Sequence, residues 1–161
     1  MSMPVGETLQ DLELAAVDRL AEATALLAEG MPTGACYLAG YAAEISLKAA
    51  TFRLGGARLD APVAAMRGVA QRRGEKLLPD IPLESGHNPV FWAALLQLER
   101  NARRLPDQGL LIPVVVARAR LVRSLWTVDL RYRSNAVAED DARRVMEAAM
   151  WISTQGSALW S

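Results

Sequence analysis

Apolar residues recur at intervals of three and four along most of this chain, which is the spacing that gathers them on one face of an α-helix. The clearest stripe lies between about residues 8 and 29 and consists of Leu9, Leu12, Ala16, Leu20, Ala23 and Leu27. Gly30 and Pro32 follow this stripe and predict the end of the first helix. The same spacing predicts a second long helix from about residue 33 to residue 54.

Four further helical segments are expected after the glycine pair that ends the second helix. They cover about residues 61–72, Pro89 to just before Pro106, 113–126 and 138–158. The stretch 74–89 is expected to be a loop, because glycine and proline interrupt it repeatedly. Three acidic residues open the last segment, as the positive end of a helix dipole favours.

No segment alternates apolar and polar residues in the manner of a half-buried strand. The one β-branched run, residues 112–116, contains Pro113, which argues against a central strand. The pattern therefore predicts an all-α protein, an antiparallel bundle of four to five helices with short connections. With 161 residues, the chain is expected to form one helical domain over 1–161.

Composition restricts the class of protein further. Hydrophobic residues make up 52% of the chain, which argues against intrinsic disorder. No apolar run approaches the roughly 20 residues of a membrane-spanning helix, and the N-terminus lacks the pattern of a secretory signal. We therefore expect a cytoplasmic protein with no membrane partner. One histidine and one cysteine cannot build a standard zinc site, so neither a metal nor another cofactor is expected.

Charge is unevenly distributed, although the formal net charge is zero. A zero sum excludes a protein that coats nucleic acid by bulk charge alone. Residues 1–30 carry −5, whereas residues 100–133 carry +6 from eight arginines and two aspartates. The eight arginines are Arg100, Arg103, Arg104, Arg118, Arg120, Arg123, Arg131 and Arg133. Two interpretations stay open: a solvated face that pairs with the acidic first helix, and a patch that faces phosphate or RNA.

Two segments carry candidate chemistry. In the second helix, Tyr37, Tyr41, Glu44 and Lys48 fall on one face, because they are spaced by four, three and four residues. One interpretation is an ordinary surface salt bridge between Glu44 and Lys48, and the other is a polar stripe that lines a groove.

The second segment is Trp126 to Arg133, with the sequence WTVDLRYR. It is compatible with a helix end capped by cations, or with a local ion pair between Asp129 and Arg131 or Arg133.

The motif YLAGYAAEISLKA, a histidine in the loop SGHN, and DLRY ahead of a final amphipathic helix together resemble the HEPN family. The resemblance covers about residues 10–155. It implies a dimeric all-α bundle of four or five helices, found in prokaryotic toxin–antitoxin and defence systems, often beside a small nucleotidyltransferase. Many members of the family are metal-independent endoribonucleases.

One departure from the family pattern bears directly on activity. Catalytic members carry an arginine followed four to six residues later by a histidine, near the start of the last helix. Arg131 stands at the place of that arginine, but no histidine follows it anywhere in this chain. His87 could take that role only if its loop folded over Arg131, and the alternative is that His87 anchors its loop.

Three functions therefore remain in competition. The first is a non-catalytic HEPN-like module that binds RNA, a nucleotide or a partner protein, such as a nucleotidyltransferase. Its binding residues are expected to be Arg131, Tyr132, Arg133, Tyr37, Tyr41, Glu44 and Lys48. The second is an atypical metal-independent endoribonuclease that uses Arg131 with His87.

The third is a purely structural assembly subunit, with tryptophans as interface candidates. A homodimer is expected from the resemblance. It is expected also because the small residues Ala39, Gly40 and Ala43 allow two helices to approach closely.

Overall fold

The computed structural model describes residues 7–83 and 87–161 of the chain. The α-helices within these residues are α1 (Leu9–Ala28), α2 (Pro32–Leu54), α3 (Val63–Leu77), α4 (Pro89–Ala102), α5 (Leu111–Leu125) and α6 (Glu139–Thr154). Short 3₁₀ turns accompany them: η1 (Gln108–Leu110), η2 (Val128–Tyr132) and η3 (Gly156–Leu159). In these two ranges no strand is formed beyond one isolated bridge between Thr8 and Pro62. The predicted all-α fold is confirmed.

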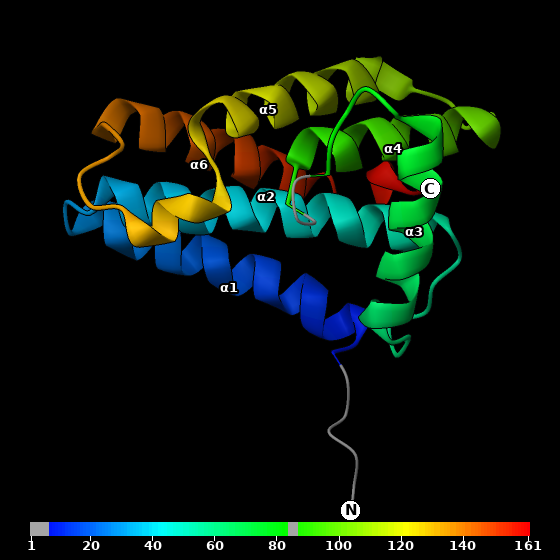
Figure 1. The fold of residues 1–161 in the computed structure, drawn as a ribbon, viewed down its shortest axis with the longest axis horizontal. Coiled ribbons are helices and arrows are strands. Elements are labelled where there is room, and N and C mark those ends of the chain that lie inside the picture. Colours follow the sequence, from blue (N-terminus) through cyan, green and yellow to red (C-terminus); the bar gives the residue numbers. More distant parts are fainter. Residues whose placement is uncertain (1–6, 84–86) are drawn as a thin grey trace, which may run out of the picture.

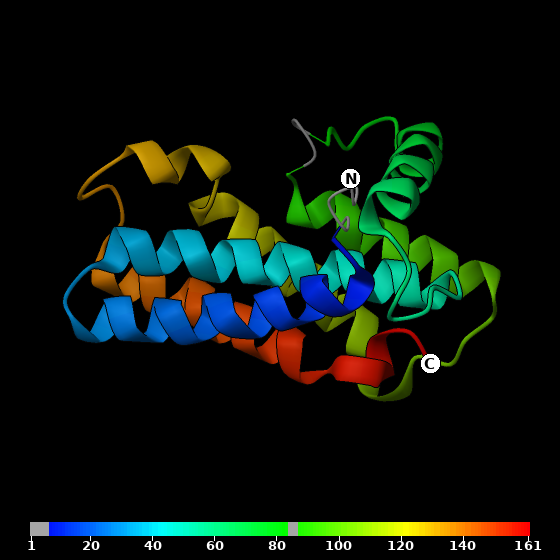
Figure 2. The same ribbon diagram turned by 90° about the horizontal axis from the view of Figure 1, so that it is seen from below.

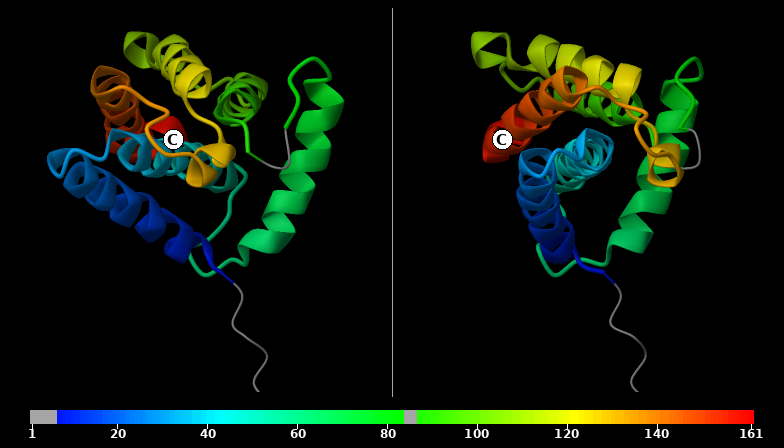
Figure 3. Two further views of the ribbon diagram at one scale, coloured as in Figure 1. Left: turned by 60° about the vertical axis from the view of Figure 1, so that its left-hand side comes forward. Right: turned by 90° about the vertical axis from the view of Figure 1, so that its left-hand side faces the viewer.

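Helix α2 forms the centre of the bundle (Figure 1). Helices α1, α4, α5 and α6 pack around it, and α3 stands across one end (Figures 1 and 3). A tight turn joins α1 to α2, so that the two helices run antiparallel and side by side (Figure 2). Because α2 is apolar on nearly every side, it is buried along most of its length, as a helix without a polar face must be.

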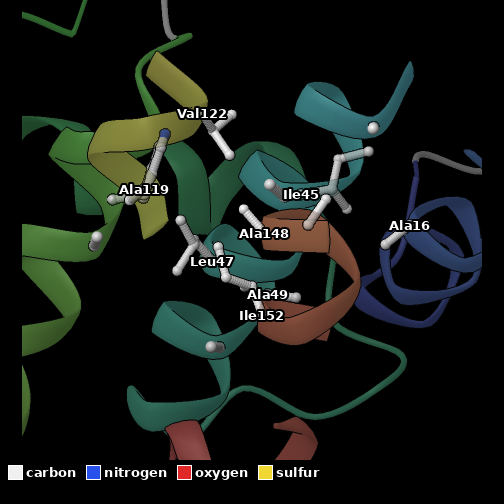
Figure 4. Packing of buried hydrophobic residues seen from close by; sticks show 14 of the residues in the cluster. Ala16, Ile45, Leu47, Ala49, Ala119, Val122, Ala148 and Ile152 are labelled. Carbon is white, nitrogen blue, oxygen red and sulfur yellow. The ribbon is translucent and has the colours of Figure 1, made fainter. Parts of the chain in front are cut away.

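Small side chains let the helices of this bundle approach closely. The part of the core in Figure 4 combines alanines from four helices with a few larger aliphatic residues; its labelled members are Ala16, Ile45, Leu47, Ala49, Ala119, Val122, Ala148 and Ile152. One very close approach is at Gly40 of α2, where a Cβ atom would overlap the indole ring of Trp126. Glycine at this position is therefore a packing requirement.

Three expected boundaries need correction. Helix α3 continues to Leu77, four residues into the stretch 74–89 expected to be a loop, because Gly74 has no Cβ and so allows Phe91 to pack against it. Helix α5 begins at Leu111, which places Pro113 in the first turn, where a missing N–H leaves no hydrogen bond unmade. The last helix ends at Thr154 and not near residue 158, since the backbone passes through a positive φ at Gly156.

Arg100 contradicts the interpretation of the arginine block as a solvated face. It is 3% exposed, and its guanidinium donates hydrogen bonds to the main-chain oxygens of Ala158, Leu159, Ser161 and Pro106. The acidic α1 does not supply the carboxylate for Arg103, which pairs with Glu99 of its own helix. This part of the block is therefore structural, and the C-terminus is tied to α4.

None of the helices in the described ranges has both the length and the apolarity that crossing a membrane would require.

Candidate functional site

A carboxylate with no exposure to solvent lies at the middle of α2. The Oε1 atom of Glu44 accepts a hydrogen bond of 2.6 Å from the Nζ atom of Lys48, and the Nδ1 atom of His87 lies 3.0 Å from the same oxygen. The side chain of Lys48 is itself only 9% exposed. A buried carboxylate is tolerated when cations and hydrogen-bond donors compensate for its lost hydration, and here both are present.

The local sequence explains how His87 reaches Glu44. Asn88 caps the N-terminus of α4 by accepting a hydrogen bond of 3.0 Å from the N–H of Val90. The amide of Asn88 also donates to the carbonyl oxygen of Pro82, at 2.7 Å. These two bonds fix the chain on either side of His87, and the imidazole then points to α2.

The contact with Glu44 also selects the tautomer of a neutral His87. A carboxylate accepts hydrogen bonds, so a neutral imidazole in this geometry carries its proton on Nδ1 and keeps a lone pair on Nε2. The side chain of His87 is 30% exposed, so it is accessible to solvent at one edge. A histidine oriented by a buried carboxylate is the arrangement in which an imidazole acts as a general base.

Two tyrosines extend this site along α2. The ring centroids of Tyr37 and Tyr41 are 6.3 Å apart, and those of Tyr41 and His87 are 6.0 Å apart. Burial, together with the negative charge of Glu44, raises the pKa of the Tyr41 hydroxyl above its ordinary value. The expected one-sided stripe of Tyr37, Tyr41, Glu44 and Lys48 is therefore present, with His87 beside it.

The surface salt-bridge interpretation of Glu44 and Lys48 is wrong, because both side chains are buried. Lys48 has a second contact that the sequence analysis missed: its Nζ atom lies 5.4 Å from the centroid of the Trp92 ring, in cation–π geometry. In the described residues, the second carboxylate oxygen of Glu44 has no hydrogen-bond partner. Spacing along a helix could not distinguish these arrangements, since burial depends on which helices pack against the stripe.

Arg131, Tyr132 and Arg133 lie in and directly after η2, a separate 3₁₀ turn. Helix α5 has already ended at Leu125, so the interpretation of this segment as a cation-capped helix end is wrong. The guanidinium carbon of Arg131 lies 4.6 Å from the centroid of the Tyr132 ring, and Tyr132 is 75% exposed. Asp129 forms no ion pair with either arginine in the part of the chain that the structure describes.

Buried residues hold η2 against α2. Trp126 is fully buried and donates its indole N–H to the carbonyl oxygen of Tyr37, at 2.8 Å, while Leu130 is 7% exposed. The η2 turn therefore packs against α2. Among described atoms, no hydrogen bond or ion pair joins Arg131 to His87; the contact of His87 is with Glu44.

The small residues Ala39, Gly40 and Ala43 are all buried in the hydrophobic core of this chain. They are therefore not a free surface for a second copy, and this argument for a homodimer fails. Two of the tryptophans considered for an interface, Trp92 and Trp126, are likewise fully buried.

In the ranges that the structure describes, no three His, Cys, Asp or Glu side chains cluster in a way that could hold a metal ion. Comparison of the chain with protein-family models, curated proteins and solved structures gives no significant match.

Proposed function

We propose that this chain is a HEPN-like helical domain that binds RNA or a nucleotide, without cleaving it, in a prokaryotic toxin–antitoxin or defence setting. The observation that carries the proposal is the exposed η2 surface, in which the Arg131 guanidinium lies against the Tyr132 ring beside Arg133. An exposed aromatic ring next to cations is the usual platform for a stacked base and its phosphate.

The surroundings of η2 support binding more than packing. Tyr132 is among the most exposed large side chains of the described residues, so its ring contributes little to the core. Trp126 and Leu130 hold the turn in place from below, so that it is presented on a rigid support. Such pre-ordering reduces the conformational entropy lost when a ligand binds.

The partner side of the proposal follows the family resemblance. A homodimer, or a complex with a nucleotidyltransferase-type protein, would also use exposed aromatic and arginine residues. A purely structural assembly subunit would bind such a protein but no RNA. Salt separates the cases, because phosphate binding weakens steeply as salt rises, whereas an apolar protein interface does not.

The direct test is fluorescence anisotropy with a labelled single-stranded RNA at several salt concentrations. We expect Tyr132→Ala to weaken binding about tenfold, the loss of one stacked base. Arg131→Gln and Arg133→Gln should each reduce the slope of log K against log salt concentration by about one, which corresponds to one released counterion. Arg120→Gln is the matched control, an exposed arginine on α5 outside this surface. Absence of binding at low salt, or equal weakening by the control, would contradict the proposal.

A second candidate, a metal-independent endoribonuclease, is favoured by the pairing of His87 with the buried Glu44. The free Nε2 of His87 would take the proton of a ribose 2′-hydroxyl as its oxygen attacks the adjacent phosphorus. The phosphorus–O5′ bond then breaks, which leaves a 2′,3′-cyclic phosphate and, after proton return, a 5′-hydroxyl. Arg131 would hold the phosphate, which requires it to approach His87 once RNA is bound.

This candidate makes the opposite prediction in a metal-free cleavage assay with excess chelator. Cleavage that is lost in both His87→Ala and Arg131→Ala would establish the ribonuclease and overturn the non-catalytic proposal. RNA that binds and stays intact, with the wild-type chain freed of any co-purified partner, would support the non-catalytic proposal.

A further inference from the structure

A cleft of about 620 Å³ lies between α3 and the bundle, lined by residues of α2, α3, α4 and the loop 55–61 that joins α2 to α3. None of the residues proposed above for RNA, nor Glu44 or His87, lines it. The volume is within the roughly 300–1,000 Å³ that small-molecule sites occupy.

The cleft exists because α3 is attached to the bundle at its two ends. At its start, the N–H of Val63 donates to the carbonyl oxygen of Glu7 at 2.9 Å, and the N–H of Leu9 donates to Ala61 at 3.0 Å. Near its end, Gly74 packs directly on the ring of Phe91. Val63 and Gly74 are the buried residues of the helix. The middle of α3 therefore spans a hollow, and Figure 3 shows the helix standing apart from the others.

The walls of the hollow are mainly apolar. Phe52 of α2 and Leu95 of α4 line it from the bundle, and Met66 and Val69 line it from α3. Val69 is 60% exposed, so part of this apolar lining is open to solvent. An apolar ligand body in the cleft would cover this surface.

Charged side chains stand at one part of the lining. Arg73 and Arg103 both pair with a single carboxylate, that of Glu99, whose side chain is 10% exposed. Arg58 pairs with Asp60. Three guanidiniums thus face two carboxylates, so the lining carries one net positive charge. Arg73 and Arg103 remain 57% and 41% exposed, which leaves donor groups available to a ligand.

We propose that this cleft binds a small amphipathic carboxylate, with its apolar body under α3 and its carboxylate at Arg73 and Arg103. The apolar lining provides most of the binding free energy through burial. The shared Glu99 leaves each guanidinium with spare hydrogen-bond donors, and these select an anion over a neutral or cationic molecule of the same shape.

The experiment uses the full chain and three unbranched probes of eight carbons in all: octanoate, 1-octanol and octylammonium. Amide chemical shifts in ¹H–¹⁵N spectra locate each probe and give its affinity. We expect octanoate to bind more tightly than octanol, and octylammonium to bind most weakly, with shifts confined to the loop 55–61 and the cleft segments of α2, α3 and α4. Equal binding of all three probes, or shifts centred elsewhere, would overturn the proposal.

Two variants test the two parts of the site, each with a control on the same helix. Arg73→Gln should weaken the binding of octanoate roughly two- to fivefold and leave the binding of octanol unchanged, because a half-exposed ion pair contributes only modestly. Arg72→Gln, which does not line the cleft, should change neither. Val69→Trp should fill the hollow and abolish the binding of both octanoate and octanol. Ala64→Trp, at an exposed position outside the lining, should leave the binding of both probes unchanged. Equal effects of variant and control would count against the site.

The outcome is independent of the RNA proposal. Tyr132→Ala should bind octanoate as the wild-type chain does, since η2 does not line the cleft. Loss of octanoate binding in Tyr132→Ala would contradict a separate carboxylate site.

Discussion

The Nδ1 atom of His87 lies 3.0 Å from the Oε1 atom of Glu44, across a sequence separation of 43 residues. The same oxygen accepts a hydrogen bond from the ammonium of Lys48, so one buried carboxylate joins a neighbouring turn of α2 to the loop before α4. This oxygen therefore makes one contact within α2 and one contact with a residue far away in the sequence.

Removal of either member of the buried Glu44–Lys48 ion pair should lower the free energy of unfolding substantially. We expect Glu44→Leu and Lys48→Met each to destabilise the fold by roughly 3–5 kcal/mol, because each leaves an uncompensated buried charge. The double variant Glu44→Leu with Lys48→Met should recover much of that loss, since no charge is left behind. Urea unfolding followed by circular dichroism measures all three. Additive losses in the double variant would show that the pair is not coupled.

Gly40→Ala should disrupt the contact between α2 and Trp126. A Cβ atom there would overlap the indole ring, so the ring must move, at a cost of about 1–3 kcal/mol. Gly68→Ala is the matched control on α3, because its Cβ would lie 3.4 Å from the flexible end of Arg72. The control should be neutral or stabilise the protein by about 0.5–1 kcal/mol through helix propensity. Thermal unfolding of both variants distinguishes the two effects.

Arg100→Met should release the C-terminus from α4. The variant leaves main-chain oxygens of residues 106, 158, 159 and 161 without their guanidinium donor, and the loss at the buried oxygen of Leu159 costs about 1–3 kcal/mol. Hydrogen exchange at residues 156–161 should accelerate more than exchange in α1. Arg120→Met, on an exposed position of α5, should remain within about 0.5 kcal/mol of the wild type. Unchanged protection of the C-terminus in Arg100→Met would contradict this role.

Cys36 should be unreactive in the folded chain. The residue is fully buried, and burial, assisted by the negative charge of Asp141, raises the pKa of its thiol from about 9 to about 12. Because the thiolate is the reactive form, a thiol reagent at pH 8 should label Cys36 only after urea unfolds the protein. Rapid labelling without denaturant would contradict the burial of Cys36.

The same shift predicts a loss of stability at alkaline pH. The folded thiol keeps its proton above pH 9, where the unfolded thiol loses it, so the unfolded state gains stability as pH rises through 9 and towards 12. Tyr41, whose pKa is also raised, acts in the same direction above pH 10. The free energy of unfolding should fall over this window, and Cys36→Ala should reduce the part of the slope that begins near pH 9.

Local patterns were sufficient to predict most helices. The first two helices begin and end within about a residue of their predicted bounds, since capping residues, glycine pairs and apolar spacing act over one or two turns. The same rules placed Tyr37, Tyr41, Glu44 and Lys48 on one face of α2. Gly74 is the instructive exception, because a glycine that normally ends a helix is here required by the ring of Phe91.

The sequence by itself thus determined the all-α class, the principal helices and the membership of the polar stripe on α2. Only the tertiary structure decided that this stripe is buried, that His87 contacts Glu44, that Arg100 holds the C-terminus, and that a hollow remains under α3. The physical reason is range: helix periodicity depends on residues three and four apart, whereas burial and ion pairing depend on which distant helices pack together.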